Sequence, residues 1–391
     1  MVATFQRALT RAYYHSNHPL LLILLTLTAY ASFIVTTLSL HNNDISYFIQ
    51  AGDMFTDSNV APEGLTVLEN SYGYDGQFYY RLALDPFTTK KTDFGIVIDN
   101  PPYRNQRILY PLFTWILSTG NSYYVPIVMI GVNVAFLCLI AYATGQYIQG
   151  VGSHVIFGLA VVLYPGFLFS VSRNLTEIVE VSLIILSLQL LTKRYYLFSA
   201  LAATAAILAK ETALLWILSV LIVGIYKQIT SGTFRWSNYF FIPLAVYIGW
   251  QAFLGMIWGE IPLLSASGNN IGLPFSGILK LVIEVISLDT YLKQLWFVYS
   301  CFLLAIAIAT TVLVIKNKYF NHESLSWLFY LMLCISLTES VWVEDTAFLR
   351  ATTEFVVLAV LLLIRMKSKV AVPLTIGVTL LWFYWYTTRG F

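Results

Sequence analysis

Residues 19–40, PLLLILLTLTAYASFIVTTLSL, decide the class of this protein because they form a long, mainly apolar run without a charge. About 20 such residues in an α-helix cross the hydrocarbon core of a bilayer, which is about 30 Å thick. The run is too long for the core of a typical signal peptide, and no A-x-A cleavage site follows it. We therefore interpret it as a retained first membrane span.

The composition of the whole chain agrees with a membrane location. Of its 391 residues, 58% are hydrophobic and only 11% are charged, and the mean hydropathy is +0.73. A water-soluble domain of this size needs a more polar surface. The formal net charge is only +2 and no long run of Lys and Arg occurs, so we expect membrane lipids as partners and no nucleic acid.

Further apolar runs have about the length that a membrane span requires. They lie at 123–147, 153–171, 175–192, 195–209, 213–227, 237–256, 294–315, 325–341, 348–364 and 370–387. We predict an all-α, polytopic transmembrane protein with about eleven spans. Lys210 and Glu211 separate two short runs, which form either two spans joined by a tight turn or one run broken at membrane depth.

Basic residues fall on alternate predicted loops. They are Arg7, Arg11, Lys193, Arg194, Lys227, Arg235, Lys316, Lys318, Arg365, Lys367 and Lys369. Because cytoplasmic loops are enriched in Lys and Arg, we predict a cytoplasmic N-terminus and an extracytoplasmic loop after the first span. The predicted single integral membrane domain, 1–391, comprises a cytoplasmic N-terminus (1–18), an extracytoplasmic loop (41–122), a transmembrane bundle (123–256), a flexible extracytoplasmic loop (257–293) and C-terminal spans (294–391).

The loop 41–122 is the longest predicted loop and holds nine of the 20 acidic residues. Its segments DISYFIQAGDMF, GYDGQFYYRLAL and ILYPLFTWIL carry apolar residues at helical spacing, so we predict short helices along the membrane surface. The second extracytoplasmic loop contains SASGNNIG, a composition typical of a mobile segment.

The first loop also carries the strongest candidates for chemistry. In YDGQFYYRLA, residues 74–83, Asp75 stands at the start of an aromatic helix and Arg81 near its end. Asp44 closely follows the first span, and a carboxylate at the membrane surface can act as a base toward a lipid-borne substrate. The structural alternative is that Asp75 caps the helix and Arg81 pairs with Asp85.

Several other charged residues point to a polar cavity. Arg104 and Arg107 follow in the same loop, where they either bind phosphate in paired hydrogen bonds or anchor the chain at the interface. Charges that interrupt the later apolar runs are costly, and all map to the predicted outer side. They are Glu177, Glu180, Lys210, Glu211, Arg350 and Glu354. Local alternatives are a capping box from Asn174 to Glu177 and an ion pair between Arg350 and Glu354.

The order of these segments resembles the GT-C class of polytopic glycosyltransferases, which use lipid-phosphate sugars, over about residues 19–230. YDGQFYYRLA is similar to the WDGxYFxxIA segment of the mannosyltransferase that adds the second mannose of GPI anchors. It is also similar to the YDGQFYY segment of bacterial proteins assigned to cell-surface glycopolymer formation. ILAKETALL resembles the turn between two spans of such enzymes, with Lys210 where Arg is usual and Glu211 where Pro is usual.

The resemblance implies transfer of a sugar from a polyprenyl-phosphate donor to a lipid or glycan acceptor outside the membrane. A first-loop aspartate acts as the base in such enzymes, and Asp75 is the first candidate by position, followed by Asp44. The bacterial inner membrane is favoured over the endoplasmic reticulum. The residues that we expect at the donor phosphate are Arg81, Arg104, Arg107, Lys210 and Arg350. Those that we expect at the sugar or acceptor are Tyr74, Gln77, Tyr79, Glu177 and Glu211.

Other readings of the sequence stay open. A divalent metal can bind clustered aspartates, but only His41 accompanies them at ligand spacing, so we predict a reaction without metal or cofactor. A glycolipid transporter or flippase also needs a polar cavity and charged residues in its spans. An accessory subunit without catalytic activity, or an enzyme that moves whole lipid-linked glycans, would have the same sequence features.

Overall fold

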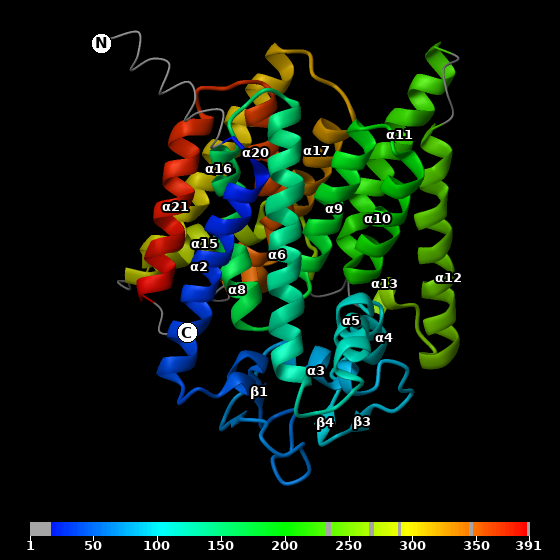
Figure 1. Cartoon of the computed structure of the whole chain (residues 1–391), viewed down its shortest axis with the longest axis vertical. Helices are drawn as coiled ribbons and strands as arrows, with labels where there is room; N and C mark the ends of the chain where they lie inside the picture. Colours follow the sequence, from blue (N-terminus) through cyan, green and yellow to red (C-terminus); the bar gives the residue numbers. More distant parts are fainter. Residues whose placement is uncertain (1–16, 232–235, 266–269, 288–290, 344–346, 389–391) are drawn as a thin grey trace.

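The computed structural model describes residues 17–231, 236–265, 270–287, 291–343 and 347–388. These residues form a bundle of helices, and the first large loop packs against one end of it (Figure 1). In the described part of the chain, strands are confined to two short pairs, so the predicted all-α class is confirmed. The strands are β1 Ala51–Gly52 beside β2 Val67–Leu68, which are parallel, and β3 Thr92–Asp93 beside β4 Ile96–Val97, which are antiparallel.

Five helices of the described chain are long and apolar enough to cross a membrane. They lie at Pro19–Leu40 (α2), Val125–Gly150 (α6), Glu211–Ser231, Ser237–Trp258 and Trp296–Lys316. The pair Val155–Val162 and Pro165–Ser172, bent by 51°, makes a sixth if it is one span. Proline lacks the backbone N–H that would continue the helix, which explains the break. The predicted number of eleven spans stays a prediction.

The outer surface of the long helices is apolar. On α2, the side chains of Leu20, Leu24 and Val35 are 61–62% exposed. A water-soluble protein rarely exposes a contiguous apolar surface of this kind, whereas lipid chains cover it without cost. The protein is therefore embedded in a membrane.

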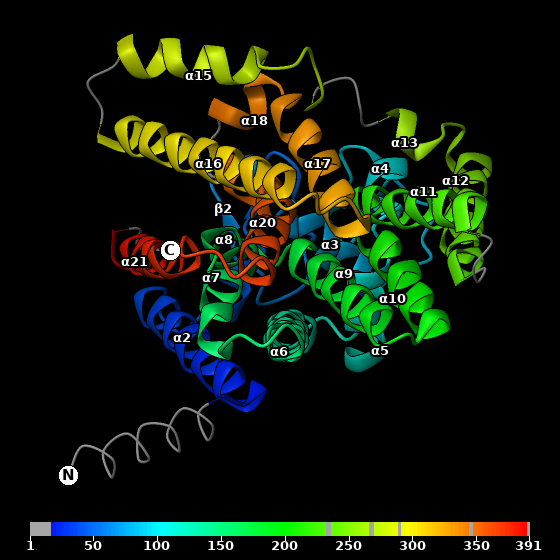
Figure 2. The same ribbon diagram turned by 90° about the horizontal axis from the view of Figure 1, so that it is seen from above.

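Shorter helices occupy the middle of the bundle. α20, Thr353–Arg365, is buried from its first residue to Ile364, and it lies among α9 (Glu177–Thr192), α16 (Tyr291–Lys316) and α17 (His322–Ile335) (Figure 2). α21, Ala371–Thr388, lies beside α2 at one side. The remaining helical elements are η2 Val155–Gly158, α7 Leu159–Val162, α8 Pro165–Ser172, α10 Tyr196–Ala209, η3 Glu211–Ala213, α11 Leu214–Ser231, η4 Trp236–Phe240, α12 Phe241–Trp258, α13 Pro262–Ser265, α15 Ser276–Ser287, α18 Glu339–Val343 and α19 Ala347–Ala351.

The first loop keeps only part of the predicted helix pattern. α3 (Gly76–Leu84) and α5 (Leu109–Ser118) match two predicted segments, although α3 is buried along its whole length and does not lie on a surface. The first predicted helix is wrong: it is reduced to a 3-10 turn, η1 (Ile45–Ile49), because Gln50 adopts a left-handed conformation with φ of 54°. A short helix, α4 (Pro101–Asn105), begins at two prolines, which favour a first helical turn.

Two further features concern the boundaries between predicted segments. Lys210 is extended, so α10 ends at Ala209 and a new helix begins at Glu211; the number of spans that these two helices form stays a prediction. The predicted flexible loop 257–293 contains two unpredicted helices, α13 and α15. Residues 266–269, at the centre of SASGNNIG, lie outside the described residues.

Lys193 and Arg365, two of the basic residues in the orientation argument, lie at the end of the bundle that is remote from the first loop. Lys193 Nζ lies 3.0 Å from Gln146 Oε1, and Arg365 Nη1 lies 3.3 Å from the Tyr147 hydroxyl, both near the end of α6. The first loop contacts the start of α6, where the Tyr110 hydroxyl donates to the Met129 carbonyl. Arg7, Arg11 and Arg235, which also entered the orientation argument, lie outside the described residues.

Candidate functional site

A cavity of about 240 Å³ lies where the first loop meets the breaks between helices. Its charged lining comes from the first loop, the start of α9, the turn after α10 and α19, and consists of Arg107, Glu177, Lys210, Glu211 and Arg350. Its apolar lining comes largely from α13 and from the chain around α17 and α18, and includes Leu263, Ile271, Leu333, Leu337 and Val341. The cavity therefore offers both charge and apolar surface to one ligand.

Asp75 is bound by two arginines beside this cavity. Its Oδ1 lies 2.9 Å from Arg104 Nη1, and its Oδ2 lies 2.9 Å from Arg350 Nη1. Burial raises the pKa of Asp75, but the guanidinium groups of Arg104 and Arg350 have the opposite and larger effect, so this pKa lies well below its usual value. The side chain of Asp75 makes no capping hydrogen bond, so the helix-cap alternative is wrong.

Gly76 explains why α3 can begin so close to the rest of the bundle. A Cβ atom at this position would lie 2.2 Å from the carbonyl oxygen of Arg173 and 2.6 Å from that of Ile49. Both distances are far below van der Waals contact, so only glycine fits. The Asp-Gly pair thus places the Asp75 carboxylate at a fixed point between the loop and α8.

Arg104 is held from several sides. Its Nε and Nη2 donate to the two carboxylate oxygens of Asp99 at 2.9 and 2.7 Å, a bidentate pair, and its guanidinium carbon lies 4.6 Å from the centre of the Phe78 ring. Burial lowers the pKa of Arg104, but Asp75 and Asp99 outweigh this effect and raise the pKa above its usual value. Arg104 therefore remains charged and fixed in orientation.

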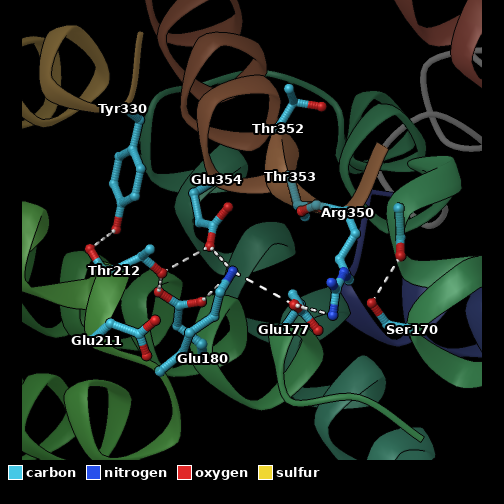
Figure 3. Close-up of polar contacts among 12 residues, drawn as sticks. Ser170, Glu177, Glu180, Glu211, Thr212, Tyr330, Arg350, Thr352, Thr353 and Glu354 are labelled. Atoms are coloured by element: carbon cyan, nitrogen blue, oxygen red, sulfur yellow. Dashed lines mark hydrogen bonds and ion pairs between the residues drawn. The ribbon is translucent and has the colours of Figure 1, made fainter. Parts of the chain in front are cut away.

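Arg350 reaches Asp75 from the other half of the chain. Its Nη1 also lies 3.5 Å from Glu177 Oε1, and its guanidinium carbon lies 5.2 Å from the centre of the Tyr74 ring. Figure 3 shows Arg350 extended toward Glu177. The expected pair with Glu354 is wrong, because Glu354 binds Lys210 instead.

Lys210 lies among three buried carboxylates. Its Nζ is 2.8 Å from Glu354 Oε1, 3.4 Å from Glu180 Oε2 and 3.7 Å from Glu177 Oε1. The Thr212 hydroxyl lies 2.5 Å from Glu180 Oε1 and 3.2 Å from Glu354 Oε1 (Figure 3). Buried carboxylates require a partner charge, so Lys210 joins α9, the turn after α10 and α20 into one charged unit.

Arg107 is paired with Glu211 in the same cavity. Its Nε lies 2.9 Å from Glu211 Oε2, its Nη1 donates to the Tyr79 hydroxyl at 3.1 Å, and its Nη2 contacts the Tyr103 hydroxyl. Burial lowers the pKa of Arg107, and the Glu211 carboxylate more than restores it, so the pKa is raised. The unusual Glu of the ILAKETALL turn is thus the counter-ion of a first-loop arginine.

Of the predicted site residues that do not line the cavity, Asp75, Arg104, Tyr74 and Tyr79 contact its charged groups or each other. Arg81, Gln77 and Asp44 have other partners. Arg81 is buried and donates to the Lys90 carbonyl at 2.7 Å and to the Thr88 hydroxyl at 3.3 Å, which also replaces the expected pairing with Asp85. Gln77 accepts from Gly52 N–H and from the Thr56 hydroxyl, and so fixes the loop. Asp44 accepts from Ser46 N–H at 2.8 Å and begins η1.

The sequence did not predict several residues that hold the arginines and carboxylates of the site in place. Asp99, the bidentate partner of Arg104, and Tyr103, a neighbour of Arg107, belong to the site. The available signal was their position next to Asn100-Pro-Pro. Asn100 caps α4, and this places Asp99 just before the short helix and Tyr103 within it. Thr212 has no comparable signal, because only the break at Lys210 places its hydroxyl between two carboxylates.

No group of three His, Cys, Asp or Glu side chains in the described ranges has the arrangement needed to hold a metal ion. Metal independence therefore stays a prediction. Comparisons of the chain with family models, with curated proteins and with solved structures find no match. The resemblance to GT-C enzymes thus depends on the segments quoted above.

Proposed function

We propose that this protein is a membrane glycosyltransferase that moves a sugar from a polyprenyl-phosphate donor to a lipid or glycan acceptor. The observation that supports it best is the cavity that combines Lys210, Arg350 and apolar side chains next to the Asp75 carboxylate. A lipid phosphate is an anion attached to an apolar chain, so it complements both kinds of lining. The GT-C resemblance implies the same aspartate as the base, and Lys210 and Arg350 are both expected from the sequence at the donor phosphate.

Each charged group has a role in this proposal. The acceptor hydroxyl attacks the anomeric carbon, its proton passes to Asp75, and the bond from the anomeric carbon to the phosphate oxygen breaks. Arg350 and Lys210 stabilise the departing lipid phosphate as fixed cations whose side chains are 19% and 8% exposed. Glu177 lines the cavity and accepts hydrogen bonds from sugar hydroxyl groups.

The proposal includes the orientation in the membrane. The basic residues near the end of α6 lie on the cytoplasmic side, and the first loop with its cavity lies on the extracytoplasmic side. A count of eleven spans follows if the shorter helices also cross the bilayer. The bacterial inner membrane is the proposed location.

A glycolipid transporter is the second candidate, and one observation favours it. Two breaks, between α7 and α8 and at Lys210, interrupt helices near charged residues, and discontinuous helices are typical of transporter binding sites. A transporter carries its lipid substrate across the membrane intact and does not release polyprenyl phosphate.

The two candidates separate in one experiment. Purified protein in liposomes is given polyprenyl-phosphate hexoses and a mixture of lipid and glycan acceptors, and both released polyprenyl phosphate and the sidedness of intact donor are followed. The transferase releases polyprenyl phosphate in proportion to glycosylated acceptor. Movement of intact donor without release would establish the transporter instead.

A further inference from the structure

Asp75 is a poor base in the arrangement that the structure contains. Its Oδ2 accepts a charge-assisted hydrogen bond from Arg350 at 2.9 Å, and its Oδ1 forms an ion pair with Arg104 at 2.9 Å. Such bonds stabilise the carboxylate over the protonated acid, and a stabilised carboxylate takes a proton from a hydroxyl group less readily. Each oxygen keeps a further lone pair for an acceptor hydroxyl, but the two cations weaken both oxygens as bases. Removal of one arginine would therefore make Asp75 a stronger base.

The two arginines are held very differently. Arg104 uses two further nitrogens for its bidentate pair with Asp99, and its side chain is 9% exposed. Arg350 makes its ion pairs with described carboxylates, Asp75 and Glu177, through Nη1 alone, and its side chain is 19% exposed. Arg350 lines the cavity and Arg104 does not. Arg350 is thus the arginine that a ligand in the cavity can reach and turn.

We propose that Arg350 is a donor-operated switch, in which the phosphate of the lipid donor takes the guanidinium and thereby releases Oδ2 of Asp75. This inference rests on the proposed function, because it needs a lipid phosphate in the cavity. Arg104 keeps Oδ1 in place, so the released oxygen stays on the side of Arg350, which lines the cavity. The base is then exposed only when a donor is bound.

A competition for one guanidinium follows from this arrangement. In the resting protein Asp75 holds Arg350, and donor binding has to break that ion pair. Replacing Asp75 by a neutral side chain removes the competitor, so binding of lipid phosphate becomes tighter. A base that acts without this switch would leave the affinity for the lipid phosphate nearly unchanged on the same substitution.

The test measures the Kd of polyprenyl phosphate for the full-length protein in nanodiscs. We expect Asp75→Asn to bind about tenfold more tightly than wild type, the factor that one charge-assisted hydrogen bond corresponds to. Arg350→Gln binds more weakly than wild type. The double variant has the affinity of Arg350→Gln alone, because the group for which Asp75 competes is absent.

The double variant separates competition from simple charge removal. If Asp75→Asn tightens binding equally in the Arg350→Gln background, the general negative charge of Asp75 is responsible and the switch is overturned. Asp75→Ser, a second neutral variant, guards against a local packing change, and it also has to bind more tightly. Thermal midpoints and gel-filtration profiles establish that each variant is folded.

Failure of the inference differs from failure of the proposed function. If wild type binds polyprenyl phosphate but Asp75→Asn and Asp75→Ser bind it no more tightly, the switch is overturned and the transferase stands. If wild type binds no polyprenyl phosphate at all, the proposed donor is wrong and the switch falls with it.

Discussion

The Nη1 atom of Arg350 lies 2.9 Å from Oδ2 of Asp75, although 275 positions separate the two residues in the chain. The contact joins the start of α3, in the first loop, to α19, in the C-terminal half. Arg350 also reaches Glu177, whose neighbour Lys210 closes the charged cluster. The candidate site thus exists only when three distant parts of the chain are folded together.

Asp75→Asn should destabilise the protein in a pH-dependent way. The folded-state pKa of Asp75 lies below its usual value near 4, so its two ion pairs stabilise the fold above that pH and lose this effect as the pH falls below it. We expect a loss of about 3 kcal/mol at pH 6–8, typical of a broken buried ion pair. The measurement compares unfolding of wild type and variant between pH 3 and 8.

The difference in the free energy of unfolding between wild type and Asp75→Asn should become smaller as the pH falls. A difference that stays constant, or grows, below pH 4 would contradict the ion-pairing of Asp75. Asp85→Asn, at a nearby position of the same loop, supplies the matched control.

Glu211→Gln should destabilise the protein because it removes the carboxylate that pairs with Arg107. The side chain of Arg107 is only 5% exposed and would be left as a buried charge with tyrosine hydroxyl groups as its remaining partners. We expect a loss of about 3 kcal/mol in the free energy of unfolding in mixed micelles. Glu63→Gln, at an exposed loop position, should change the same quantity by less than about 0.5 kcal/mol. Equal effects of the two substitutions would refute the pairing.

Arg365→Gln should separate stability from ligand binding. Arg365 Nη1 lies 3.0 Å from Glu323 Oε1, and Glu323 Oε2 accepts from the Tyr147 hydroxyl at 2.8 Å. This cluster lies about 16 Å further along α20 than Glu354. We expect a loss of about 2 kcal/mol in stability and an unchanged Kd for polyprenyl phosphate. A higher Kd in a folded variant would contradict the proposed site, because it would place the lipid phosphate at the end of the bundle that is remote from the first loop.

Ser340→Trp should obstruct the cavity, because Ser340 is exposed and lines it. We expect KM for the lipid-linked donor to rise about tenfold, equivalent to about 1.4 kcal/mol of binding, with little change in kcat. Ser58→Trp fills a separate hollow of the first loop and serves as the control. A rise in KM for Ser58→Trp alone would move the donor to that hollow.

The membrane class and most helices could be predicted because apolar length has a direct physical cause. Residues 19–40 show this, since the structure has α2 at Pro19–Leu40. Breaks inside apolar runs were harder to predict. The break at Pro165 lies within the apolar run 153–171, and α15 occupies a stretch whose Gly and Ser residues favoured a loop.

The sequence predicted which residues belong to the site better than it predicted which of them form ion pairs. Charges in apolar surroundings are costly, so Lys210 and Arg350 could be found from the sequence alone. Their partners depend on tertiary packing, which no local spacing encodes. Arg350 is one turn before Glu354 but binds Asp75 from the first loop, and Arg81 shares α3 with the site yet points into the loop core.

The most direct test is a single-turnover measurement with saturating polyprenyl-phosphate sugar and acceptor, comparing wild type, Asp75→Asn and Asp44→Asn. Asparagine keeps the shape of aspartate and removes the base. We expect wild type to release polyprenyl phosphate, Asp75→Asn to slow this step by about 10²–10⁴-fold while still binding the donor, and Asp44→Asn to remain close to wild type. Two results would contradict the assignment of Asp75 as the base: release of polyprenyl phosphate by Asp75→Asn at the wild-type rate, or loss of release in Asp44→Asn alone.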